Sequence, residues 1–257
     1  MSEPTREELL ARISVLEKQV GRREHGRRLT RREDEVERRV DGLIRDFDRY
    51  VQVFDDAPAF TKAGQCQKHV ATIRMRREIG SVAAAAGDDR FLGSLYATVE
   101  AWGIGQRGSK LLPLDAFCSG IQKCLPHLEE LEAEKIETAT GDLDRVTASL
   151  WQLIYSLRIV DNEAKLVPCT KALHHLLPDL VVPMDRVFTR VFFAWHVPEF
   201  QYQQEKVFRH AFRHFSRIAK AVMPSRLVGD GWRTSSTKVL DNALVGFCQA
   251  ENLPVPS

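Results

Sequence analysis

Lys165-Leu166-Val167-Pro168-Cys169-Thr170-Lys171-Ala172-Leu173-His174-His175-Leu176-Leu177-Pro178-Asp179-Leu180-Val181-Val182-Pro183-Met184-Asp185-Arg186 is the stretch that decides the fold. Its leucines recur at helical spacing, which predicts a short buried helix. Pro178 must end or kink that helix, because proline lacks the backbone N–H that the helix needs. The chain then turns through Val182-Pro183 towards a second, apolar helix expected over residues 187–195.

The aspartate at the end of this stretch has two interpretations. Asp185 stands where the second helix is expected to begin, and an aspartate there can cap the helix by accepting a backbone N–H. The same carboxylate, held between two rigid elements, can instead lie at the mouth of a cleft and take part in chemistry. The choice between the two decides the function.

Length and composition favour a water-soluble helical protein whose cysteines are reduced. The 257 residues are 44% hydrophobic and 28% charged, which suits one substantial domain with an appendage. The five cysteines are irregularly spaced and form no C-x-x-C, so no disulfide framework and no metal site is predicted. No apolar run approaches a membrane span of about 20 residues, and the first residues are too polar for a secretory signal. We therefore expect a cytoplasmic protein without a membrane segment, metal or cofactor.

The N-terminal segment is predicted to be a charged helical arm. Residues 1–54 carry apolar positions at spacings of three and four, the heptad-like pattern of a coiled coil. Eight arginines within residues 21–40 are interleaved with acids. They either touch phosphates or form a salt-bridged, solvated face. The boundary with a globular domain over residues 55–257 is placed after this arm, which needs docking on that domain or a homo-oligomeric partner.

The rest of the chain reads as helices without strand-like alternation, so the predicted fold is an all-α, compact multi-helix domain. Helices are expected over residues 61–86, 90–102, 113–137, 142–159, 199–223 and 238–250. Asparagine, glycine and proline mark the turns between most of them.

Positive charge gathers in the last third of the chain. Residues 185–257 hold ten Lys/Arg against six Asp/Glu, although the whole chain carries only +2. The helix over residues 199–223 has an apolar face with Phe208 and Phe212, and a cationic stripe on the opposite face. The stripe either contacts a phosphate backbone or is a solvated face. Its members are Lys206, Arg209, Arg213, Arg217 and Lys220.

A glycine-rich turn over residues 103–110 is a second candidate for phosphate contact. Arg107 and Lys110 accompany three closely spaced glycines, whose backbone N–H groups can face an anion. The G-x-x-x-x-G-K-[ST] spacing of a P-loop is absent. The segment is either a nucleic-acid contact or a plain turn.

The stretch from Lys165 to Asp185 resembles the helix-hairpin-helix (HhH-GPD) DNA glycosylase superfamily. The order is a lysine, a buried helix and then Val182-Pro183-Met184-Asp185, with 20 residues from Lys165 to Asp185. The likeness covers roughly residues 150–195. Its hairpin, residues 160–164, lacks the glycines with which the family's hairpin donates backbone N–H groups to DNA, so docking is expected through other groups such as the cationic stripe.

The resemblance implies a catalytic carboxylate at Asp185 and an amine nucleophile at Lys165 or Lys171. It implies that a damaged or modified base leaves the stack for a pocket, in repair or in defence against foreign DNA. The aromatic candidates for holding that base are Trp102, Tyr96, Trp195 and Trp232. Other candidate cleft residues are His174, His175, Lys238 and Asp241.

The alternative from a different class is a non-catalytic helical protein that binds nucleic acid or a protein partner. In that interpretation the arm and the cationic stripe make the contacts, and Asp185 is only a helix cap. Lys238 and Asp241 are then an internal ion pair rather than groups that face a substrate.

Overall fold

The computed structural model describes residues 31–105, 109–139 and 142–254, and across them the predicted all-α fold is confirmed. The only pairing outside helices in these ranges is an isolated antiparallel bridge between Leu111 and Val160. Residues 31–45 are helical as well. The helices that follow are α2 (Phe47–Asp56), α3 (Gln65–Ile79), α4 (Val82–Gly87), α5 (Asp89–Ala101), α6 (Leu114–Lys123), α7 (Leu125–Leu131), α8 (Leu143–Ser156), α9 (Leu166–Leu176), α10 (Phe188–Phe192), α11 (Val197–Tyr202), α12 (Gln204–Val222), the 3₁₀ turn η1 (Pro224–Leu227) and α13 (Ser236–Ala250).

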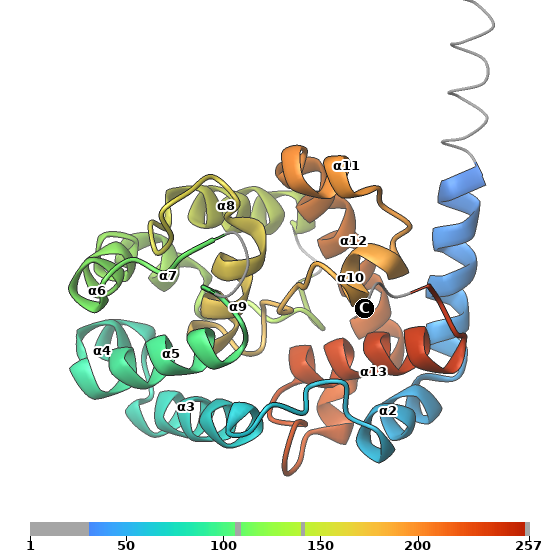
Figure 1. Cartoon of the computed structure of the whole chain (residues 1–257), viewed down its shortest axis with the longest axis horizontal. Helices are drawn as coiled ribbons and strands as arrows, with labels where there is room; N and C mark the ends of the chain where they lie inside the picture. Colours follow the sequence, from blue (N-terminus) through green and yellow to red (C-terminus); the bar gives the residue numbers. More distant parts are fainter. Residues whose placement is uncertain (1–30, 106–108, 140–141, 255–257) are drawn as a thin grey trace, which may run out of the picture.

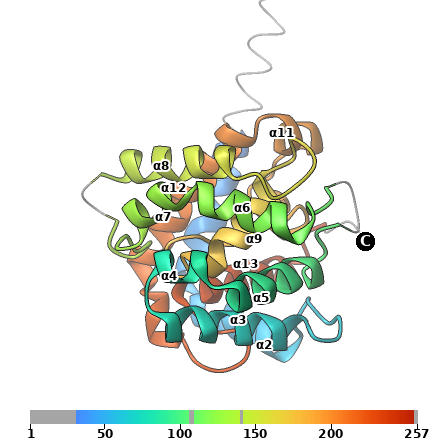
Figure 2. The ribbon, with the colours of Figure 1, turned by 90° about the vertical axis from the view of Figure 1, so that its left-hand side faces the viewer.

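The helices form two groups that lie side by side. Helices α3 to α9 make one half of the molecule, and α2 with α10 to α13 makes the other (Figure 1). Seen from the side of the first group, α8 lies near the top, α3 near the bottom and α9 between them (Figure 2). Nine of the eleven residues of α9 are buried, so the decisive stretch runs through the middle of the core.

The described part of the predicted arm is docked on this core. Val36, Val40 and Leu43 are fully buried, and Phe47 and Tyr50 are nearly so. These are positions of the heptad-like stripe, and they belong to the same hydrophobic cluster as α9 and α13. Packing against the rest of the chain therefore buries the apolar stripe that would otherwise need a coiled-coil partner. Residues 1–30 of the predicted arm lie outside the described residues.

Several predicted helices are divided, each at a residue with a local reason. The helix expected over residues 61–86 breaks at Gly80, whose φ of 88° ends α3. The Ser81 hydroxyl then accepts a hydrogen bond from the Ala84 N–H and caps α4. Pro126 begins α7 rather than kinking a longer helix. The amphipathic segment 199–223 divides at Gln203 into α11 and α12.

The closest approach between helices brings α13 against α2. A Cβ added to Gly246 would lie 2.0 Å from the carbonyl oxygen of Tyr50, which is backbone and cannot move aside by a rotamer change. Only glycine permits this contact. Gly93 in α5, by contrast, has room for a side chain, because nothing lies within 4 Å of a Cβ added there.

Gly246→Ala is expected to destabilise the protein by about 1–3 kcal/mol, the usual cost of overpacking a core. Gly93→Ala should be neutral or stabilising by up to about 1 kcal/mol, since alanine is the better helix former. Urea unfolding of the two variants measures the difference. Equal effects of the two substitutions would contradict the packing of α13 on α2.

Candidate functional site

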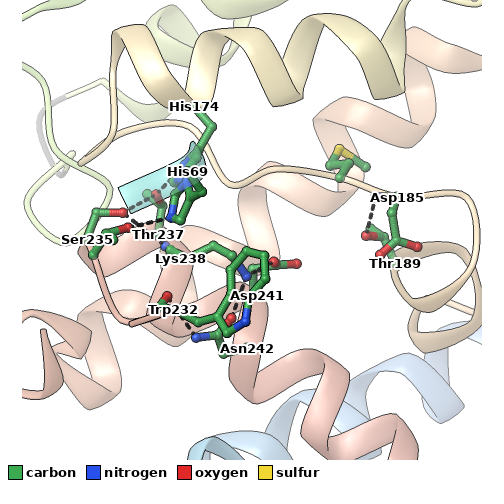
Figure 3. Close-up of polar contacts among 12 residues, drawn as sticks. His69, His174, Asp185, Thr189, Trp232, Ser235, Thr237, Lys238, Asp241 and Asn242 are labelled. Carbon is green, nitrogen blue, oxygen red and sulfur yellow. Dashed lines mark hydrogen bonds and ion pairs between the residues drawn. The ribbon is translucent and has the colours of Figure 1, made fainter. Parts of the chain in front are cut away.

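Between the two helix groups lies a small cavity of about 50 Å³. Three aromatic rings and four charged side chains line it. The lining residues are Phe60, Gln65, Trp102, Lys171, Pro183, Asp185, Trp232, Lys238 and Asp241. Figure 3 shows Lys238 and Asp241 projecting from α13 beside Trp232, with Asp185 on the segment that precedes α10. The structure thus brings together six of the residues that the sequence singled out for chemistry, for holding a base or for a cleft.

The two carboxylate oxygens of Asp185 have different surroundings. One fits the helix-cap interpretation, and the other fits the interpretation of a carboxylate at a cleft. Its Oδ1 accepts hydrogen bonds of 2.6 Å from the backbone N–H groups of Val187 and Phe188, and its own N–H donates to Thr189 Oγ1 at 2.9 Å. The predicted helix cap is therefore present. Its Oδ2 is buried and has no hydrogen-bond partner among the described residues. The cap fixes the carboxylate, and the second oxygen stays available at the cavity.

Burial gives the two nearest charged groups opposite pKa shifts. Burial, and then the neighbouring charge of Asp241, raise the pKa of Asp185, while Lys171 and the two backbone N–H groups act against this rise. Burial lowers the pKa of Lys171, although Asp185 and Asp241 act against this shift. The Lys171 ammonium donates to the Trp102 carbonyl oxygen at 2.8 Å. A carboxylate and an amine with such shifts in one cavity are typical of an active site.

Lys238 and Asp241 form the ion pair that was one of the two sequence interpretations, and they also line the cavity. The Lys238 Nζ lies 2.7 Å from Asp241 Oδ2 and 2.5 Å from Asn242 Oδ1. Both side chains of the pair are less than 5% exposed. The ammonium also lies about 5 Å from the ring centroids of Phe54, Phe60 and Trp232. Carboxylate, amide and ring faces together hold this buried charge.

Of the four aromatic candidates for holding a base, two lie at the cavity. The rings of Trp102 and Trp232 are 6.1 Å apart between centroids, and the indole N–H of Trp102 is buried without a partner. Tyr96 packs against Phe117 and Trp195 against Phe193, away from the cavity lining. Core packing accounts for those two rings.

A fully buried histidine cluster adjoins the cavity wall. His175 Nδ1 lies 2.8 Å from the Lys171 carbonyl oxygen, so this nitrogen carries the proton and donates. His175 Nε2 then accepts from His69 Nδ1 at 2.9 Å, and His69 Nε2 accepts from the Thr234 hydroxyl at 2.7 Å. Both rings are neutral in this arrangement, and burial favours it because burial lowers the pKa of each histidine. It ties α9 to α3 and to the segment before α13.

His174 completes the cluster from the neighbouring position on α9. Its Nδ1 donates to the Val181 carbonyl oxygen at 2.9 Å and lies 3.1 Å from Thr237 Oγ1. Its Nε2 is buried without a partner. Neither histidine lines the cavity, so their role is to orient α9 and thereby Lys171.

Lys165, the other candidate nucleophile, lies elsewhere. Its ammonium donates to the Tyr155 carbonyl oxygen at 2.7 Å and covers the Tyr155 ring at 4.7 Å. It lines a separate groove of about 760 Å³ between α8, α11 and α12. The structure therefore places Lys171, and not Lys165, beside Asp185.

The groove and the cavity are joined by two further hollows. The hollow next to the cavity measures about 520 Å³ and shares Phe60, Lys171 and Asp185 with it. A third, of about 200 Å³, shares Arg186 and Arg190 with that hollow and Gln204 with the groove. These neighbouring hollows form a row from the exposed side of α12 past two arginines to Asp185, and this row is called the trough below.

The cationic stripe of α12 is divided between the trough and the rest of the molecule. Lys206, Arg209 and Arg213 line the groove. Arg217 instead pairs with Glu37 and Asp41 of the N-terminal helix, and Lys220 donates to the Ala139 carbonyl oxygen. Acids from another element neutralise Arg217, a contact that the spacing within one helix does not reveal.

The glycine-rich turn is described only in part. Arg107 lies outside the described residues. Lys110 is exposed, and its backbone N–H donates to the Asp161 carboxylate at 3.0 Å. Its neighbour Ser109 lines the two middle hollows of the trough. The turn therefore borders the trough, as a phosphate contact requires.

Sequence reasoning missed Phe60, Gln65 and His69. Phe60 follows a predicted helix break, and Gln65 and His69 fall on a helix with little amphipathic pattern, so no periodicity marks them. A histidine buried at 0% exposure beside two tryptophans becomes visible only in three dimensions.

No protein-family model, curated protein or solved structure matches the chain. None of the described helices combines the length and the apolarity that a membrane crossing requires. Within the described ranges, no three His, Cys, Asp or Glu side chains are grouped so that they could hold a metal ion. The function is therefore argued from the geometry of the cavity and the trough.

The buried histidines predict that stability falls in mild acid. Burial lowers the pKa of His175 from 6.5 to about 4. At pH 7 the His175 ring is neutral in both the folded and the unfolded chain. Below pH 6.5 the ring binds a proton in the unfolded chain, whereas in the folded chain it stays neutral until about pH 4. Stability is therefore lost as the pH falls through this window, by roughly 3 kcal/mol for this group. Urea unfolding at several pH values measures the loss, and a flat profile between pH 7 and 5 would contradict it.

Proposed function

We propose that this chain is a DNA glycosylase-like enzyme that cleaves the N-glycosidic bond of a damaged or modified base, in repair or in defence against foreign DNA. The observation that carries the proposal is the unpartnered Oδ2 of Asp185, buried at an aromatic cavity at the end of an arginine-bordered trough. A carboxylate used only as a helix cap needs neither the lysine nor the rings around it.

The helix order supports the proposal. Helices α8 and α9 are joined by residues 157–165, and α9 is followed by an extended segment that ends at the capped start of α10. This order of helix, hairpin, helix and capping aspartate agrees with the resemblance found in residues 150–195. This resemblance concerns only the order of the elements, and the chemistry of the cavity is the stronger support for the proposal.

The proposed reaction follows from where charge develops. When the glycosidic bond breaks, its electron pair leaves with the base, and positive charge builds on the sugar. The Asp185 carboxylate stabilises that charge, and it can accept a proton from the water that attacks the sugar. Its raised pKa suits a base that must release the proton again near neutral pH.

The base enters the cavity from the adjoining hollow. At about 50 Å³ the cavity is smaller than the engineered cavity of about 150 Å³ that holds one benzene ring. The hollow of about 520 Å³ that shares Asp185 with it is large enough. We infer that Phe60 and Trp232 move aside when a base enters, as aromatic side chains at binding sites commonly do on binding.

Asp185→Asn is expected to abolish base release and to leave folding intact. Asparagine caps helices as well as aspartate does, so the bonds to Val187 and Phe188 are kept while the negative charge is lost. Loss of one such electrostatic contact typically slows a reaction by about 10²–10³-fold. Release of bases from genomic DNA, measured by mass spectrometry, is the assay.

Asp88→Asn is the matched control, since Asp88 caps α5 through the Phe91 N–H at 2.8 Å, away from the cavity. Full base release by Asp185→Asn, or none by the wild type on any DNA, would reject the enzyme. A chain that still bound DNA would then be the non-catalytic binding protein of the alternative.

Lys171 is expected to be the amine that reacts if the enzyme also cuts the strand. A neutral amine attacks the sugar carbon C1′ as the base leaves with the electron pair of the glycosidic bond. The sugar ring then opens at its C1′–O4′ bond, O4′ takes the proton released by the nitrogen, and C1′ and the nitrogen form a Schiff base. Borohydride should trap a covalent adduct with the wild type and with Lys165→Met, but not with Lys171→Met. An adduct that survives in Lys171→Met and disappears in Lys165→Met would contradict the placement of Lys171 beside Asp185.

A further inference from the structure

The groove between α8, α11 and α12 has a composition that the cavity chemistry does not explain. It holds two tyrosines that are strongly exposed, at 58% for Tyr155 and 76% for Tyr202. Tyr155 stands near the end of α8 and Tyr202 at the end of α11, so the two rings come from different elements. Large aromatic side chains are normally buried, and two in one groove mark a binding surface.

Cations line the same groove. Lys206, Arg209 and Arg213 occupy one face of α12 and span about 10 Å along its axis. With Lys165 they make four positive charges against two from Glu163 and Glu205. Lys206 pairs with the largely buried Glu199 at 3.8 Å. Arg209 pairs with Glu205 and Arg213 with Asp144, in each case between two exposed side chains. Exposed pairs contribute little, so these cations can exchange their partners for phosphates.

One of the two rings is held in place. The Lys165 ammonium lies 4.7 Å above the Tyr155 ring and is itself anchored to the Tyr155 carbonyl oxygen. Lys165 is only 6% exposed, so the anchored ammonium supports the ring and leaves the other face of the ring open. A rigid, half-open aromatic ring is a platform for a flat ligand.

We propose that this groove binds an unpaired DNA strand, and that the substrate of the Asp185 site is therefore single-stranded or locally opened DNA. Aromatic rings gain stacking energy only from bases that are not already stacked in a duplex. The cations along the groove can contact the phosphates of the same strand. The trough continues from this groove past Arg190 and Arg186 to Asp185. The inference rests on the proposed function for the identity of the ligand and adds the state of the strand.

The test compares a fluorescent oligothymidylate of about 20 nucleotides with its duplex, by anisotropy, on the full chain carrying Asp185→Asn. The single strand is expected to bind more tightly than the duplex. Tyr202→Leu should weaken single-strand binding by about fivefold or more, because stacking of one base on one ring is worth at least that factor. Tyr202→Phe should bind as the parent does, since the ring is kept.

The cations have a separate signature. Arg209→Ala and Arg213→Ala should each reduce the dependence of log K on log salt by roughly 0.7, the value for one phosphate contact on a single strand, while the Tyr202 variants leave it unchanged. Arg74→Ala is the matched control, because Arg74 is 79% exposed on α3 and lines no part of the trough. It should change neither affinity nor slope.

The outcomes separate this inference from the proposed function. Duplex binding as tight as single-strand binding, or an unchanged affinity in Tyr202→Leu, would overturn the inference even if bases are released. Ring-dependent strand binding by a chain that releases no base would uphold strand binding by the groove and reject the enzyme. Absence of any DNA binding would reject both.

Discussion

The burial of α9 on nearly every side is the constraint on which the site depends. Because nine of its eleven residues are covered, the helix cannot rotate or slide without exposing apolar surface. His175 forms a hydrogen bond with His69 of α3, which in turn accepts one from Thr234 before α13, and His174 donates to Val181 in the segment that follows α9. Lys171 at one end of this network and Asp185 after it are therefore held relative to each other by the core itself.

The polar groups of the site are stable because each has a local reason to be there. Asp185 is retained by the start of α10, Lys238 by Asp241, Asn242 and three rings, and Lys171 by a backbone carbonyl oxygen. Removal of Asp241 would leave the buried Lys238 ammonium without its opposite charge, which is costly. The Asp185 Oδ2 differs from these groups, because it is buried at the cavity without a hydrogen-bond partner among the described residues.

The charge distribution also has a structural explanation. Acids of the N-terminal helix neutralise Arg217, and a salt bridge of 2.7 Å joins Arg32 to Glu199. Lys206, Arg209 and Arg213 remain at the groove, and among the described residues their ion pairs are with Glu199, Glu205 and Asp144 rather than with the N-terminal helix. Docking of this helix thus selects which part of a continuous stripe can meet a polyanion.

Local pattern was sufficient to predict the all-α fold, the buried helix at residues 166–176 and the cap at Asp185, because helical periodicity and capping depend on neighbours within a few positions. It was also sufficient to pair Lys238 with Asp241, which are three residues apart. The choice of Lys171 over Lys165, the division of the cationic stripe and the roles of Phe60 and His69 were decided only by the tertiary structure. These features join residues up to 180 positions apart. Such contacts depend on which helix faces pack together. The sequence of one helix does not show which side chains the helix packed against it contributes.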